Sequence, residues 1–182
     1  PYMKTRVFVQ WKKRIPWLLV LMISASFTQA VINTYQDAII AAGYSVMTSF
    51  IPMLMDTGGN SGSQASVSVI RAITLNEIQF KDMFKVVWKE SRVALLCGLT
   101  LAVCNFFKLI IIDGAQVSVS LTVCLTLIVT VFVAKVVGAV LPIVAKKLGF
   151  DPTVMASPLI TTVVDVLSLM IFFNIANIVL GI

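Results

Sequence analysis

Residues 152–182 read PTVMASPLITTVVDVLSLMIFFNIANIVLGI, an apolar run with one carboxylate, Asp165, near its middle. A helix needs roughly 20 residues to cross a bilayer, so this run predicts a membrane span with Asp165 near the membrane centre. A charged carboxylate in hydrocarbon is costly, so such residues usually face a bundle interior or water and mark an ion or proton path. Transport is therefore the first hypothesis for this chain.

Helical spacing places further residues on the same stripe as Asp165. They are Asp151, Val154, Pro158 and Thr161 before it, and Ser168 and Phe172 after it. We expect this stripe to form one wall of a pore. Two plainer interpretations stay open: Asp165 forms a structural ion pair with Lys135, and Asp151 caps the helix that begins at Pro152.

Composition independently indicates an integral membrane protein. Of 182 residues, 59% are hydrophobic and 12% are charged, and the mean hydropathy is +1.00, far from soluble averages. We expect an all-α fold of five transmembrane helices, approximately residues 15–36, 46–72, 93–112, 117–145 and 152–181. Residues 15–182 then form one membrane domain, preceded by a basic cytoplasmic lead-in at residues 1–14.

Basic residues gather in three segments, which set the expected orientation. They precede the first span (Lys4, Arg6, Lys12, Lys13, Arg14), separate the second from the third (Arg71, Lys81, Lys85, Lys89, Arg92), and follow the fourth (Lys146, Lys147). The positive-inside rule makes these segments cytoplasmic, so the N-terminus is cytoplasmic and the C-terminus lies outside. The net charge of +6 is therefore a topology signal, and no nucleic-acid partner is expected.

Cysteine and histidine usage narrows the chemistry of any site. Cys97, Cys104 and Cys124 lie inside expected spans without paired spacing, so we expect them to pack as small apolar groups. The chain has no histidine, so a metal site must use oxygen ligands, which suit hard cations such as magnesium or calcium. Without histidine or an acid pair at catalytic spacing in one span, the sequence disfavours an enzyme.

The second expected span carries an unusual polar sequence, PMLMDTGGNSGSQ at residues 52–64. On a helix, Gly58 and Gly62 lie on a small-residue stripe with Ala65 and Ser66, which favours close helix packing. The polar residues Asp56, Asn60, Ser63 and Gln64 lie on a different face. Asn60 and Gln64 either hydrogen-bond neighbouring helices or line a water-filled path.

Three motifs together resemble the membrane domain of the MgtE family of magnesium channels. They are the 52–64 string with its GGNxGxQ core, which includes Gly59; GAVLP at residues 138–142; and KKLGFDPTVMASPLITTVVDV at residues 146–166. The resemblance covers essentially the whole chain. The family's cytoplasmic N domain and CBS-domain pair are absent from these residues. The chain is either part of a longer protein, in which we expect such regulatory domains, or a naturally shorter relative.

The resemblance implies a homodimer in the prokaryotic inner membrane that moves Mg²⁺ into the cytoplasm through a pore lined by the second and fifth spans. Asp165 then acts as the main pore carboxylate, with the Thr161 carbonyl and Ser157 nearby on the cytoplasmic side. The family often has asparagine at the Ser157 position. Asp151 is a weaker candidate at the cytoplasmic mouth, and a role for Asp56 does not carry over from the family.

Physical chemistry gives this implied pore a reason. A two-fold axis brings two Asp165 carboxylates together, where their charge offsets a divalent ion. Mg²⁺ holds its waters tightly, so we expect a largely hydrated ion bound through outer-shell hydrogen bonds, with the Val154 carbonyl left free by Pro158. The sequence leaves open which of Mg²⁺, Mn²⁺, Co²⁺ and Ca²⁺ is preferred. It also leaves open two other functions, a proton- or sodium-coupled carrier and a non-transporting scaffold.

Overall fold

The computed structural model describes residues 5–152 and 158–181, and every regular element within these ranges is helical. The α-helices are α1 (Val7–Ala41), α2 (Ile51–Thr74), α3 (Met83–Ile111), α4 (Val117–Lys147) and α6 (Pro158–Leu180). Two short 3₁₀ helices, η2 (Ser45–Phe50) and η3 (Phe80–Asp82), precede α2 and α3. The all-α fold class is confirmed for the described residues.

Four helices among the described residues are long and apolar enough to cross a membrane. They are the helices at Val7–Ala41, Phe80–Ile111, Val117–Lys147 and Leu159–Leu180. The 24 residues of α2 give it a length of about 36 Å, enough to span, but the glycines and polar residues between Asp56 and Gln64 lower its hydropathy. A span at α2 and the orientation of the termini stay predictions.

The helix ends differ from the hydropathy boundaries in physically understandable ways. Residues 46–50 were expected inside the second span, but they belong to η2. Helix α2 begins at Ile51 with Pro52 in its first turn, where a missing N–H costs nothing. The helices α1 and α3 begin at Val7 and Met83, well before the apolar stretches start. A helix can include charged residues near its start, such as Lys12 and Lys13 in α1 and Lys85 in α3, so hydropathy marks only its apolar part.

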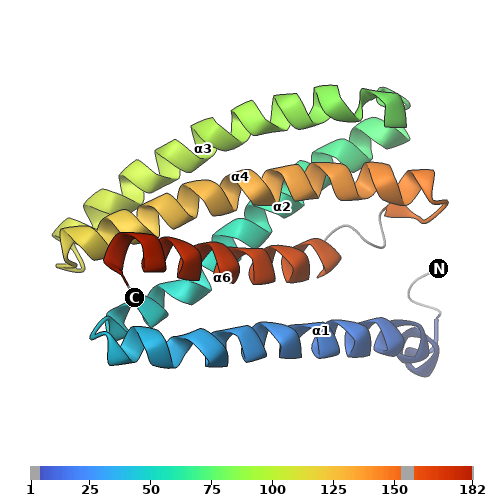
Figure 1. Cartoon of the computed structure of the whole chain (residues 1–182). Coiled ribbons are helices and arrows are strands. Elements are labelled where there is room, and N and C mark those ends of the chain that lie inside the picture. The colour runs from blue at the N-terminus through green and yellow to red at the C-terminus, as the bar shows by residue number, and fades with distance from the viewer. Residues whose placement is uncertain (1–4, 153–157, 182) are drawn as a thin grey trace.

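Helix α4 forms the centre of the bundle (Figure 1). It packs against α2, α3 and α6; α2 also packs against α6, and α1 lies beside α6. Half of the most apolar window of α4 is buried, against 6% for α1. The side chains of α1, such as Leu18, Met22 and Phe27, therefore stay exposed, as expected of a helix that faces lipid or another chain.

The largest core cluster joins all five α-helices, and it corrects part of the predicted pore stripe. Ser168 and Phe172 were expected on a pore wall, but each is only 1% exposed. The Ser168 hydroxyl donates to the carbonyl of Val164 at 2.6 Å, and the Phe172 ring packs in the cluster with Leu54 and Leu169. The stripe prediction is wrong for this half of α6, because α6 turns these residues toward the bundle core.

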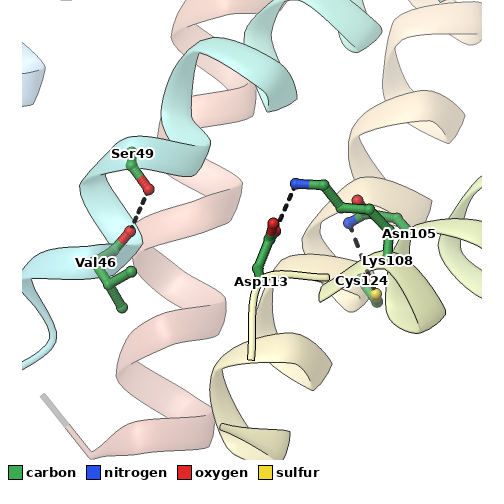
Figure 2. A network of polar contacts seen from close by, with 6 residues as sticks. All are labelled: Val46, Ser49, Asn105, Lys108, Asp113 and Cys124. Carbon is green, nitrogen blue, oxygen red and sulfur yellow. Dashed lines mark hydrogen bonds and ion pairs between the residues drawn. The ribbon is translucent and has the colours of Figure 1, made fainter. Parts of the chain in front are cut away.

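Polar contacts tie down the connection between α3 and α4 (Figure 2). Lys108 and Asp113 form an ion pair across this turn, and the Asn105 amide lies 4.0 Å from the Cys124 sulfur. All three cysteines are free, as expected, and Cys124 is buried. Cys104 is exposed, so its predicted packing is wrong, because α3 contacts α4 along only one of its faces.

Near the start of α2, the Ser49 hydroxyl donates to the Val46 carbonyl at 2.6 Å and closes the η2 turn (Figure 2). The Pro52 ring follows in the first turn of α2. The chain therefore changes from the η2 turn to the long α2 helix over a few residues. This fixes the residue at which α2 starts, and with it the faces on which its glycines and polar residues lie.

Candidate functional site

The glycines of α2 form the face that packs against α4 and α6. A Cβ added at Gly58 would lie 2.8 Å from Thr130 Cγ2 and 2.9 Å from Val164 Cγ1. A Cβ added at Gly59 would lie 2.9 Å from Thr161 Cγ2. Such distances are shorter than van der Waals contact, so a larger residue at either position would force α2 away from α6. The predicted packing role of these glycines is supported by this geometry.

The closest approach in the bundle is the crossing of α2 and α4 at Gly62 and Gly138. A Cβ added at Gly138 would overlap the Gly62 carbonyl oxygen and lie 2.8 Å from the carbonyl carbon. At Gly62, an added Cβ would lie 3.0 Å from the Ala134 oxygen. The two backbones therefore touch directly, as small residues allow in membrane helices. Sequence reasoning gave Gly138 no role, although the glycine in GAVLP was visible.

The polar residues of α2 lie on another face, as the helical spacing predicted. Asp56, Asn60 and Gln64 are exposed, whereas Gly58, Gly62, Ala65 and Ser66 are buried. The Asn60 side-chain amide donates to the Asp56 carboxylate at 3.1 Å. Within residues 5–152 and 158–181, neither the Asn60 nor the Gln64 side chain bonds another helix. Among the described residues, these amides therefore join no two helices.

Asp165 is half-buried on α6, on the part of the helix that packs against α2. Its neighbours one turn away and next to it, Thr161, Val164 and Ser168, meet the glycine face of α2. The Asp56 carboxylate acts on Asp165 as a like charge. The glycine contacts thus hold two carboxylates from different helices near each other. Neighbouring like charges are offset by a cation between or beside them.

Lys135 does not neutralise Asp165. Lys135 is 5% exposed on α4, and the salt bridges of the described residues join only Lys85 to Asp82 and Lys108 to Asp113. The structural ion pair between Lys135 and Asp165 is therefore not formed. This leaves the Asp165 charge without a lysine or arginine partner in the part of the chain that the structure describes.

The remaining predicted site residues lie toward the start of α6. Thr161 is half-exposed, with its methyl group beside Gly59. Pro158 begins α6, but its side chain is not described, and Val154 and Ser157 lie outside the described residues. Asp151 is exposed at the end of the segment before them. The structure thus brings Thr161 and Asp165 to the α2 face and leaves the expected cytoplasmic ligands untested.

The described residues of one chain do not form a closed metal cage. No group of three acids or cysteines is arranged to hold a metal among residues 5–152 and 158–181. Two carboxylates and exposed amide oxygens suit a hydrated hard cation better than a fully dehydrated one, because Mg²⁺ usually keeps several waters and few direct carboxylate contacts. The arrangement therefore presents oxygen acceptors of the kind that a hydrated hard cation binds.

Comparison with known proteins gives a consistent result. A family model named MgtE, described as "Divalent cation transporter", matches residues 51–175. The "Magnesium transporter MgtE" of Thermus thermophilus is 32% identical over 170 residues, which cover 93% of this chain and 37% of that protein. Proteins of the same name from Bacillus subtilis and Enterococcus faecalis are 31% and 29% identical over 95% and 91% of this chain. The chain spans less than two fifths of the length of these relatives.

Proposed function

Because the chain belongs to the MgtE family of divalent cation transporters, we propose that it forms a pore domain that passes hydrated Mg²⁺ into the cytoplasm. The pore lies between two copies of the chain and is lined by α2 and α6 of each. The observation that carries this proposal is the position of Asp165 on α6, beside the polar face of α2 and without a basic partner among the described residues. The role is transport rather than catalysis.

The need for a second copy follows from the cost of charge in hydrocarbon. On the surface of one chain, Asp56 is exposed in the second turn of α2 and Asp165 is half-buried in the third turn of α6. A carboxylate that faced lipid at this depth would be strongly destabilising, so this face must meet water or protein. A two-fold axis next to α2 and α6 provides both, since it encloses a wet path and brings two Asp165 side chains together.

The proposed ion site uses the chemistry of Mg²⁺. The Asp165 carboxylates and the Thr161 carbonyls accept hydrogen bonds from the waters of the ion, which spares the cost of stripping them. Ser157, Val154 and Asp151 extend the path toward the cytoplasmic mouth. Mn²⁺, Co²⁺ and Ca²⁺ are further candidate ions, because all accept oxygen ligands.

The topology that goes with this pore has five spans, with α2 as the span that hydropathy alone does not reveal. The basic ends of α2 and α4, with Arg71, Lys146 and Lys147, lie on the cytoplasmic side with the N-terminus, and the turn at Asp113 lies outside. Residues 15–182 form the membrane domain in a prokaryotic cytoplasmic membrane, and residues 1–14 lead in from the cytoplasm. In the full-length protein, cytoplasmic domains regulate the pore.

A coupled carrier is the second candidate, and the proximity of Asp56 to Asp165 favours it specifically. Two nearby acids at membrane depth can take up and release a proton as a cation leaves and enters. A carrier requires an imposed proton or sodium gradient for Mg²⁺ entry. A channel passes current with voltage and the Mg²⁺ gradient alone, so planar-bilayer recording separates the two.

The test of the proposed pore is Mg²⁺ influx into proteoliposomes with Asp165→Asn, which keeps the size of the side chain and removes its charge. Influx should fall about a hundredfold, because a bound divalent ion loses its main counter-charge. Asp113→Asn, in the α3–α4 turn, is the matched control and should leave influx unchanged. Equal influx through the Asp165→Asn variant and the wild type would refute the assignment of Asp165.

A further inference from the structure

A cavity of about 530 Å³ lies between α2 and α3, includes Lys135 of α4, and borders the polar face of α2 at Asn60 and Gln64. Thr57, Asn60, Ser61 and Gln64 of α2, Leu96, Cys97, Thr100 and Leu101 of α3, and Lys135 of α4 line it. The helices α2 and α3 meet at the 75–79 turn and diverge away from it, while both pack on α4 (Figure 1). The cavity occupies part of this wedge and has the size of a small-molecule site.

Lys135 is the unusual member of this lining. It is 5% exposed, and no described acid lies within ion-pair distance of its ammonium. The Ser61 hydroxyl oxygen is buried without a hydrogen-bond partner in the described chain. Buried polar groups are normally satisfied, and an unpaired buried ammonium is particularly costly. The cavity therefore offers donors from two helices, the Lys135 ammonium and the Ser61 hydroxyl, and the hydroxyl has no partner in the described chain.

The acids of this chain do not supply the missing partner. Asp56 and Asp165 are the acids at membrane depth in the described helices, and they lie near each other on the α2 and α6 face rather than at Lys135. The α2 wall is polar, with Thr57, Asn60 and Gln64, whereas the α3 wall is largely apolar, with Leu96, Cys97 and Leu101. Donors from α2 and α4 that face an apolar wall on α3 fit an amphiphile with an anionic oxygen head and an alkyl chain.

Depth favours a single-chain carboxylate over a phospholipid headgroup. Lys135 precedes Lys147, at the basic end of α4, by twelve residues, or about 18 Å along the helix axis. A phosphate group tied to a glycerol stays near the membrane surface, whereas the small carboxylate of a fatty acid can move deeper along a gap between helices. We propose that the cavity between α2 and α3 binds an alkyl carboxylate, with its head on Lys135 and Ser61.

The test is saturable binding of tritiated palmitate to the full chain in nanodiscs of neutral phosphatidylcholine, with protein-free nanodiscs as the blank. Wild type should bind saturably, and Lys135→Met should bind roughly tenfold to a hundredfold more weakly, because a charge-assisted hydrogen bond is lost. Lys135→Arg should retain binding. Lys108→Met, at the exposed end of α3, is the matched control and should bind like the wild type.

Two further arms make each outcome decisive. Ser61→Ala keeps Lys135 and should weaken binding several-fold, which guards against misfolding of the Lys135→Met variant. Phosphatidylglycerol added to the nanodiscs distinguishes the source of the anion: competition supports an acidic phospholipid, and its absence supports the free carboxylate. The proposal would be overturned if wild type showed no saturable binding, or if Lys135→Met bound as well as wild type. It would also be overturned if Lys135→Met lost the dimer, because that result indicates that a carboxylate of a second copy is the partner of Lys135. These readouts do not involve Mg²⁺ flux, so they fail or succeed independently of the pore.

Discussion

Gly138→Ala should separate α2 from α4 and destabilise the protein. The new Cβ would overlap the Gly62 carbonyl oxygen and lie 2.8 Å from its carbonyl carbon. Both partners are backbone atoms in the middle of long helices, so no rotamer change relieves the overlap. One of the two helices must therefore move away from the other, and this movement loosens the close packing around Gly62.

The magnitude follows from two opposing effects. Overpacking by a methyl group costs about 1–3 kcal/mol, and more where the backbone must move. Alanine recovers about 1 kcal/mol of helix propensity relative to glycine. Gly98→Ala is the matched control, because its Cβ would lie 3.3 Å from its nearest neighbour, Ile128 Cα, which needs only a small adjustment. We expect Gly98→Ala to be near neutral and Gly138→Ala to be less stable by about 2 kcal/mol.

The assay is thermal unfolding of the purified protein in detergent, with Mg²⁺ influx as a second measurement. A difference of about 2 kcal/mol corresponds to a Tm lower by about 4–8 °C for a chain of this size. Influx should also fall, because the shift of α2 changes the position of Asp56 relative to Asp165. A Gly138→Ala variant as stable as Gly98→Ala, or more so, would refute the direct backbone contact between α2 and α4.

Three further substitutions test separate parts of the structure. Gly62→Leu should prevent α2 from packing on α4 and α6, lowering the Tm by more than Gly138→Ala does; an unchanged melting curve would contradict the role of the glycine face. Asp56→Asn should reduce Mg²⁺ influx less than Asp165→Asn does, because Asp56 is exposed and its carboxylate already accepts a hydrogen bond from Asn60. An influx equal to that of the wild type would show that Asp56 is not part of the ion path. Asp113→Asn should lower stability by no more than about 1 kcal/mol, since the ion pair with Lys108 is largely solvent-exposed, and a larger loss would show that this turn contributes more than its exposure indicates.

The two faces of α2 were predictable from sequence because helical spacing alone fixes which residues share a face. Glycine and small residues recur every three or four positions from Gly58 to Ser66, and the polar residues fall between them. Burial and exposure follow this division. Periodicity of one helix, however, says nothing about which other helix covers a face. The contact of Gly62 with Gly138 of α4 could therefore not be predicted from the sequence.

The pore stripe on α6 shows the same limit. Asp165 and Thr161 are partly exposed beside α2, but Ser168 and Phe172, on the same stripe, are in the core. The helices α2 and α6 cross, so one end of the stripe opens toward the polar face and the other end meets the packing face. The cavity at Lys135 could likewise not be predicted from the sequence, because a single lysine in an apolar run does not indicate whether it pairs with an acid.

The most direct test of the pore is a high-resolution structure of the dimer in a bilayer with Mn²⁺ in place of Mg²⁺, located by its anomalous scattering. We predict a peak on the two-fold axis between the two α6 helices, separated from the Asp165 carboxylates by the ion's own waters. No peak there, with Asp165 facing lipid or a dry contact between protomers, would contradict the proposed path of the ion.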